Sequence, residues 1–207
     1  MKFNRPAAPR PAFLIARSRR VSRIACTVGA VILGGLVQFH ALFVHDAPAQ
    51  TNAITHSPAE VVQKYVQLDN KGARLDAVSF ESLAPYVYWK EEPLWAKVIV
   101  INGFSVPDDY RQWEIINSLE VVIPVEFKVL GVIYFDTAGF VVDPSVEQVR
   151  VTVKVFNNRW RIIVPIFPPH VGQRRMLNFV REALQEEKGD TRRATLAALH
   201  DQLRKAK

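Results

Sequence analysis

Hydrophobic and polar residues alternate along residues 146–156, and this pattern predicts a half-buried β-strand. Asn157 and Asn158 follow, where a two-residue hairpin turn requires positive φ at both positions, a conformation that Asn tolerates. The alternation then resumes, and Pro168-Pro169 end it because proline has no N–H to donate. We therefore predict a hairpin whose apolar face comprises Val149, Val151, Val153 and Val155 on one strand and Trp160, Ile162, Val164 and Ile166 on the other.

A longer extended segment covers residues 113–135, after a strand that begins near Trp95. Pro124 cannot donate to a ladder, so we predict a bulge, a bend or an edge strand there, with a second bend at Gly131. Turns are expected at residues 136–139 and at Asp143-Pro144. One face of the segment is predicted to be apolar, with Leu119, Val121, Ile123, Val125, Phe127, Val129, Ile133 and Phe135.

Helical patterns lie on both sides of these strands. Residues 57–60, SPAE, predict a helix start with a serine cap, proline at the first position and glutamate three residues after the cap, and Gly72 is placed to end this helix. A second, shorter helix is predicted over residues 76–84. After Pro169 we expect two further helices, separated by Gly189, with Met176, Leu177, Val180 and Leu184 on the first and Leu196, Leu199 and Leu203 on the second.

This order predicts an α+β fold, with N-terminal helices packed on a strongly curved antiparallel sheet and a C-terminal helical extension. The run NRWRI at residues 158–162, followed by Pro165 and by PPH at residues 168–170, resembles the last strand of the nuclear-transport-factor-two-like superfamily. That superfamily has a cystatin-like, cone-shaped barrel and includes polyketide cyclases and ketosteroid isomerases. The resemblance covers residues 57–170 and implies a cone-barrel domain there, with residues 171–207 as a helical tail.

Most of the chain's net positive charge of +7 lies in its first 49 residues, which carry seven basic groups and one acid. The remaining residues hold 20 basic and 19 acidic groups, so we expect no nucleic-acid partner. The basic segment, the apolar residues 24–44 and the A-x-A pattern at residues 47–49 predict an export signal cleaved between Ala49 and Gln50. An uncleaved membrane anchor is the alternative, because about 20 apolar residues span a bilayer.

Both alternatives place the domain outside the cytoplasm, either periplasmic or secreted, or anchored in the inner membrane and facing the periplasm. The only cysteine, Cys26, lies in the leader, so the domain has no disulfide or thiol chemistry. Neither metal-ligand spacing nor a glycine-rich phosphate loop is found, and we predict no cofactor.

The candidates for acid–base chemistry are His170, Tyr86 and Tyr88. His170 follows two prolines, close to the predicted opening of the cone, although a surface histidine that ends a strand is the structural alternative. A ligand pocket, if present, is predicted to involve Tyr86, Tyr88, Trp89, Trp95, Phe127 and His170, and the same aromatic residues are equally suited to a core.

The leading functional hypothesis is an exported, non-catalytic domain that binds a small apolar ligand or a partner protein, because the predicted interior face lacks ionisable groups. The alternative is a lyase or isomerase with His170 as base and Tyr86 or Tyr88 as donor to an oxyanion. If the leader stays as an anchor, an assembly factor of a secretion or transport complex is a further alternative, and a homodimer through the sheet is compatible with each. If Phe127, Phe135 and Trp160 fill the cone, a protein–protein role remains.

Overall fold

A computed structural model describes residues 56–75 and 80–207, so the predicted leader and its cleavage site at Ala49 and Gln50 lie outside the described residues. Helix α1 (Pro58–Asn70) begins as predicted, because Ser57 accepts the N–H of Glu60 while the Glu60 side chain accepts the N–H of Ser57. The helix ends before Gly72, which adopts a φ of +80°. Of the second predicted helix, α2 (Phe80–Leu83) is observed, and residues 76–79 are not described.

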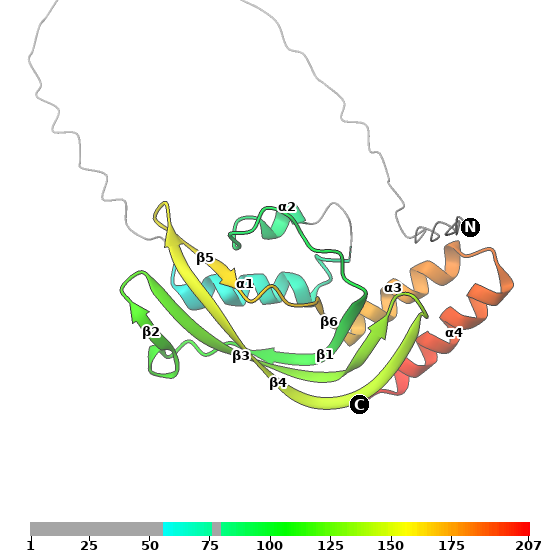
Figure 1. Cartoon of the computed structure of the whole chain (residues 1–207). Helices are drawn as coiled ribbons and strands as arrows, with labels where there is room; N and C mark the ends of the chain where they lie inside the picture. Colours follow the sequence, from blue (N-terminus) through cyan, green and yellow to red (C-terminus); the bar gives the residue numbers. More distant parts are fainter. Residues whose placement is uncertain (1–55, 76–79) are drawn as a thin grey trace, which may run out of the picture. The chain divides into compact units, whose positions relative to one another are not determined.

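The six strands form one strongly curled, mixed sheet in the order β5-β4-β3-β1-β6, with β2 also paired to β3 (Figure 1). Two of the predicted turns are observed, one at residues 136–139 and one at Asn157 and Asn158, which have φ values of 48° and 60°. The strands are β1 (Lys97–Ser105), β2 (Glu114–Asn117), β3 (Glu120–Tyr134), β4 (Gly139–Phe156), β5 (Arg159–Val164) and β6 (His170–Gly172), with a 3-10 turn η1 (Tyr110–Gln112) before β2.

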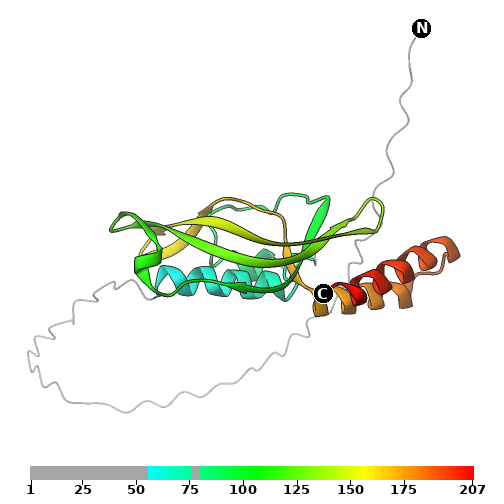
Figure 2. The same ribbon diagram turned by 90° about the horizontal axis from the view of Figure 1, so that it is seen from below.

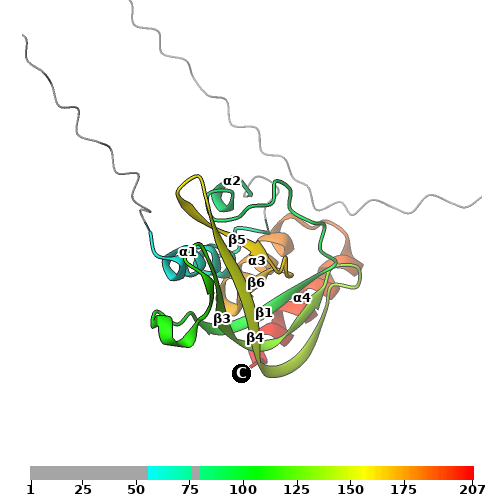
Figure 3. The same cartoon turned by 60° about the vertical axis from the view of Figure 1, so that its left-hand side comes forward.

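The sheet bends where the pairing between β1, β3 and β4 is irregular at neighbouring positions. The register shifts in β1 between Val100 and Gly103, and in the β3–β4 pairing between Val129 and Gly131. Bulges bend a strand and increase its twist, and here they lie side by side across β1, β3 and β4. Figure 3 shows the long strands β3 and β4 curving around the helical layer.

The bulge at Gly131 corrects one detail of the predicted apolar face. Val121 to Val129 alternate into the first core, as expected, but Ile133 packs in a second core on the other face of the sheet. An inserted residue reverses the direction of every side chain that follows it, which explains this change. The ends of the predicted face, Leu119 and Phe135, are exposed.

The two cores lie on opposite faces of β1. Ile99 and Ile101 pack in the first core with α1, whereas Val98 and Val100 pack in the second core with the C-terminal helices. A strand buried on both faces has a continuous apolar sequence, which is what residues 98–101 show. Figure 2 shows α1 and the C-terminal helix pair as separate helical layers of the fold.

The expectation of a purely antiparallel sheet is wrong at one edge. Residues 165–169 leave β5, carry Phe167 into the first core, and enter β6, which pairs in parallel with β1 from Ile99↔His170 to Ile101↔Gly172. Proline residues in this connection cannot continue the β5 ladder, so the chain crosses to the free edge of β1 instead. The predicted second strand is correspondingly shorter, and Val164 and Ile166 are exposed.

One prediction about proline is wrong, and of the alternatives given for the other, an unpaired edge is observed. Asp143-Pro144 is not a turn, because β4 continues through it and the two residues lie in the bulge opposite Leu130. Pro124 is not in a bulge, since it pairs in register with Arg150. On its other side β2 pairs up to Val122 and β1 from Glu126, so neither of these strands pairs with Pro124.

The C-terminal helices α3 (Gln173–Glu186) and α4 (Asp190–Lys205) form a hairpin that begins after β6. Their buried residues are those predicted from periodicity: Met176 and Val180 on α3, and Leu196, Leu199 and Leu203 on α4. They pack on Val98, Val100 and Phe140 in the second core. The helices therefore complete one face of the sheet where β1 begins.

Candidate functional site

The residues predicted for a pocket fall into two separate places. Tyr88 and Trp89 line a surface groove, whereas Phe127, Trp95 and His170 belong to, or contact, a buried group of polar side chains. Tyr86 is partly buried against the first core and accepts the N–H of Ile162 through its backbone carbonyl. The structure thus divides the predicted pocket instead of assembling it.

The buried group is centred on Asp69, at the end of α1, and on Arg74, four residues after that helix. Arg74 donates through Nε to Glu92 Oε1 at 2.8 Å and through Nη2 to the Phe167 carbonyl at 2.7 Å. Its Nη1 lies 3.4 Å from Asp69 Oδ2. We call Tyr65, Asp69, Arg74, Glu92 and His170 the buried polar cluster, because all five groups meet in this part of the interior.

Burial dominates the electrostatics of the cluster. The Asp69 side chain is 1% exposed, and this desolvation raises the pKa of its carboxyl from 3.8 to about 6, although Arg74 and the N–H of His170 act in the opposite direction. Burial alone would lower the pKa of Arg74, but Asp69, Tyr65 and Glu92 outweigh it and the pKa is raised. Burial likewise raises the pKa of Tyr65. Arg74 therefore remains charged between the buried Asp69 and the partly exposed Glu92.

His170 is not the surface histidine that its position after two prolines suggested. It is completely buried, its ring stacks on Phe127 at 4.1 Å, and its backbone N–H donates to Asp69 Oδ2 at 2.8 Å. Nδ1 donates to the Pro168 carbonyl at 2.8 Å, and Nε2 lies 3.5 Å from Glu147 Oε2. The interaction with His170 lowers the pKa of the Glu147 carboxyl, although partial burial acts in the opposite direction. Neither Tyr86 nor Tyr88 is among the described contacts of His170.

The cluster leaves four polar atoms without a hydrogen-bond partner among the described residues: Tyr65 Oη, Asp69 Oδ1, Glu92 Oε2 and His170 Nε2. Trp89, which lines the groove and lies edge-on to Tyr65, also has a buried Nε1 without such a partner. A cluster of perturbed, buried groups resembles the electrostatics of an acid–base site. A substrate would have to reach it, however, and the side chains of Asp69, Arg74 and His170 are each at most 1% exposed. Its geometry fits a structural role, in which α1, β6 and the segment around Glu92 are held together.

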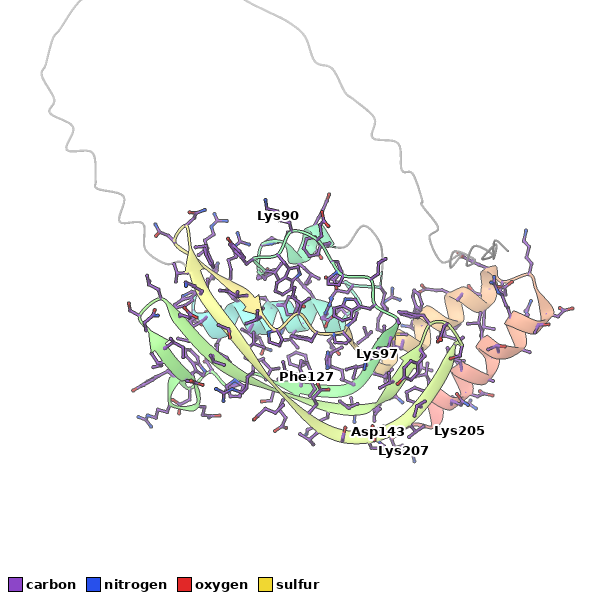
Figure 4. All side chains as sticks on the ribbon, in the orientation of Figure 1. Lys90, Lys97, Phe127, Asp143, Lys205 and Lys207 are labelled. Carbon is purple, nitrogen blue, oxygen red and sulfur yellow. The ribbon has the colours of Figure 1, made fainter. Side chains whose placement is uncertain are left out.

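The interior beside this cluster is filled by aromatic side chains. Phe167 lies edge-on to Tyr65 and to His170, and Phe127 and Trp160 are also buried. Figure 4 shows side chains occupying the space between α1 and the sheet, with Phe127 among them. Of the three residues that were expected to fill a cone, Phe127 and Trp160 are buried and Phe135 is exposed.

The surface groove lies between residues 80–90 and the turn that joins β4 to β5, and its volume is about 680 Å³. Its position is fixed by parallel pairing: Tyr88 donates its N–H to the Ile162 carbonyl at 2.9 Å, and Ile162 donates its N–H to the Tyr86 carbonyl at 2.8 Å. Tyr88 stacks on Phe156 with ring centroids 4.3 Å apart. One wall of the groove is therefore a flat aromatic surface.

Three basic side chains line the same groove: Lys90, Arg159 and Arg161. Arg161 donates through Nη1 to the Ala84 carbonyl at 2.6 Å, and its pKa is lowered by partial burial and by the nearby Arg159. Among the residues that the structure describes, none of the three forms an ion pair, and no acid lines the groove. The groove thus combines unbalanced positive charge with an aromatic wall.

Sequence reasoning missed the charged members of both places. Asp69 falls on the same helical face as Val62, Tyr65 and Val66, and an acid on an apolar stripe was the available signal for a buried partner. Arg159 and Arg161 belong to the NRWRI motif, which by itself does not indicate a binding role for them. Their alternation with the buried Trp160 and Ile162 places both arginines on the outer face of β5.

A search against family models, curated proteins and solved structures finds no match for this chain. Among the described residues there is no group of His, Cys, Asp and Glu suited to a metal ion. Within the same part of the chain, no helix has the length and apolar character needed to cross a bilayer.

Proposed function

We propose that this chain is a non-catalytic binding domain whose ligand or partner occupies the surface groove. The observation that supports this most directly is the contrast between the filled interior and the open groove. The interior holds Phe127, Phe167 and Trp160, whereas the groove offers the exposed Tyr88 ring, stacked on the partly buried Phe156, and three cations without ion-pair partners in the described residues. Unpaired cations next to an aromatic surface are suited to a binding partner that brings both negative charge and apolar contact.

The proposal keeps two expectations from the sequence. One is a cone-shaped barrel related to the nuclear-transport-factor-two-like superfamily, which the α+β fold and the strongly curled sheet support. The other is a position outside the cytoplasm, supported by the basic and apolar composition of residues 1–49. A lyase or isomerase centred on His170 is less well supported, because the imidazole is closed in by Phe127 and Phe167 and is oriented by Pro168.

Native mass spectrometry of the full-length chain, purified from its own cells in mild detergent, tests this proposal. We expect a retained molecule or second chain on the wild-type protein. The Tyr88→Ala variant should lose it, because this ring is 58% exposed and forms the aromatic wall with Phe156.

Tyr134→Ala is the matched control, since Tyr134 is also an exposed tyrosine but lies at the end of β3. It should retain the bound mass as the wild type does. A mass retained equally by Tyr88→Ala, or no retained mass on any of the three proteins, would contradict binding at the groove.

A further inference from the structure

We propose that the groove recognises an extended, acidic segment of another protein, an inference that rests on the binding function proposed above. The first argument is spacing. Arg159 and Arg161 are two residues apart on β5, so their Cα atoms are separated by roughly 6.5 Å along the strand. Side chains at alternate positions of an extended ligand repeat at the same interval, so two acids at positions i and i+2 match the two arginines in register.

The second argument is charge. Arg159 and Arg161 lie on the same face of β5, and both line the groove. Burial first, and then the like charge of Arg159, lower the pKa of Arg161. Lys90 adds a third positive charge, and no acidic side chain lines the groove. An arginine can hold a carboxylate with paired hydrogen bonds, so two carboxylates would relieve this repulsion.

The third argument concerns size and exposure. A small ligand is usually buried over most of its surface, whereas here Tyr88 is 58% exposed and Lys90, Asn157 and Arg159 are also exposed. Figure 4 shows Lys90 pointing outward from the segment above α1. A longer segment can cover such an open surface, with an apolar or aromatic residue placed against the Tyr88–Phe156 stack.

The chain's own leader does not complement this surface. Residues 1–49 carry seven basic groups and a single acid, so their charge has the same sign as the groove. An acidic segment from a different protein is the occupant that the charge pattern favours.

A displayed library of random octapeptides, selected on the immobilised full-length chain, tests the proposal. We expect enriched peptides with acidic residues at i and i+2 and an apolar or aromatic residue beside them. Synthetic copies should bind at least about tenfold more weakly to Arg159→Glu, and replacing their two acids with Gln should weaken binding by a similar factor. Their affinity should also fall as salt is raised.

Arg193→Glu is the matched control, because Arg193 is an exposed arginine on α4, and it should bind the peptides as the wild type does. Circular dichroism of each variant confirms that it is folded. The inference is overturned if the library yields no acidic pattern, if Arg159→Glu binds equally well, or if benzoate or inorganic phosphate displaces the peptides at equal concentration. A small molecule found by native mass spectrometry and lost in Tyr88→Ala would also overturn it, while leaving the proposed binding function intact.

Discussion

The carboxylate of Asp69 accepts the backbone N–H of His170 at 2.8 Å, which joins the end of α1 to the start of β6. The two residues are 101 positions apart in the sequence. Arg74 lies against the same carboxylate oxygen and also holds the Phe167 carbonyl, just before β6. The position of the parallel edge strand therefore depends on one buried acid and one buried arginine.

Arg74→Met should be strongly destabilising. The substitution keeps most of the side-chain volume but leaves the buried Asp69, and the partly exposed Glu92, without their shared cation. Breaking a buried ion pair on one side costs about 3–5 kcal/mol, which is a large part of the stability of a domain this size. Urea denaturation followed by circular dichroism measures the loss. Arg193→Met, on the exposed side of α4, should stay within about 0.5 kcal/mol of the wild type, and a similarly small loss for Arg74→Met would contradict this account.

Asp69 should make the domain less stable as the pH rises from about 4 to about 6. Its pKa is raised from 3.8 to about 6 in the folded state, so the unfolded chain releases this proton first and the folded state is disfavoured through that window. The free energy of unfolding of wild type minus that of Asp69→Asn should fall by roughly 3 kcal/mol between pH 3.5 and pH 7. Comparing the two proteins removes the opposite contribution of Glu147, whose pKa is lowered. A difference that is flat or increases with pH would show that Asp69 is not a protonated buried acid near pH 5.

Gly131 and Gly103 should respond very differently to alanine. A Cβ at Gly131 would lie 2.2 Å from the Val141 carbonyl oxygen, whereas a Cβ at Gly103 meets no atom within 4 Å. Gly131→Ala should therefore cost about 1–3 kcal/mol through overpacking of the bulge. Gly103→Ala should change stability by no more than about 1 kcal/mol. Equal thermal midpoints for the two variants would mean that the bulge adjusts without strain.

The turn at Asn157 and Asn158 should prefer glycine to alanine at its second position. Asn158 has a φ of 60°, a left-handed conformation in which a Cβ costs about 1–2 kcal/mol and glycine has no penalty. We expect Asn158→Ala to lower the thermal midpoint by a few degrees and Asn158→Gly to keep or raise it. The opposite ranking in thermal unfolding would indicate a different turn conformation.

Local features of this fold follow from the sequence, because they depend on residues close together in the chain. The capping box at Ser57 and Glu60 and the positive φ of Asn157 and Asn158 are examples, since backbone sterics and a single side-chain hydrogen bond determine them. The alternation of Val149, Val151 and Val153 with polar residues likewise reports burial on one face.

Long-range features could not be read in the same way. The parallel pairing of β6 depends on where a proline-rich connection crosses the sheet, and nothing in residues 165–169 specifies that destination. The prolines before His170 suggest a surface histidine at the end of a strand. In the structure its backbone N–H donates to Asp69 and its ring lies beside Glu147, and both contacts come from segments distant in sequence. The sequence predicts two of the residues that line the surface groove, Tyr88 and Trp89. It does not predict Arg159 and Arg161 there, because these arginines line a groove only once β5 packs beside residues 80–90, which are distant in sequence.

The parallel pairing of β1 with β6 also determines the order in which the molecule can be completed during synthesis. β1 ends at Ser105, but the strand that covers its outer edge begins at His170, so a growing chain carries that edge uncovered until the ribosome has added β6. Over the same interval, Asp69 lacks the backbone N–H of His170 that it accepts in the complete fold. Any chain that terminates before residue 170 lacks the His170 N–H that Asp69 accepts and leaves the edge of β1 unpaired at Ile99–Ile101. Such a chain should aggregate or be removed by proteases, while the full-length chain remains folded.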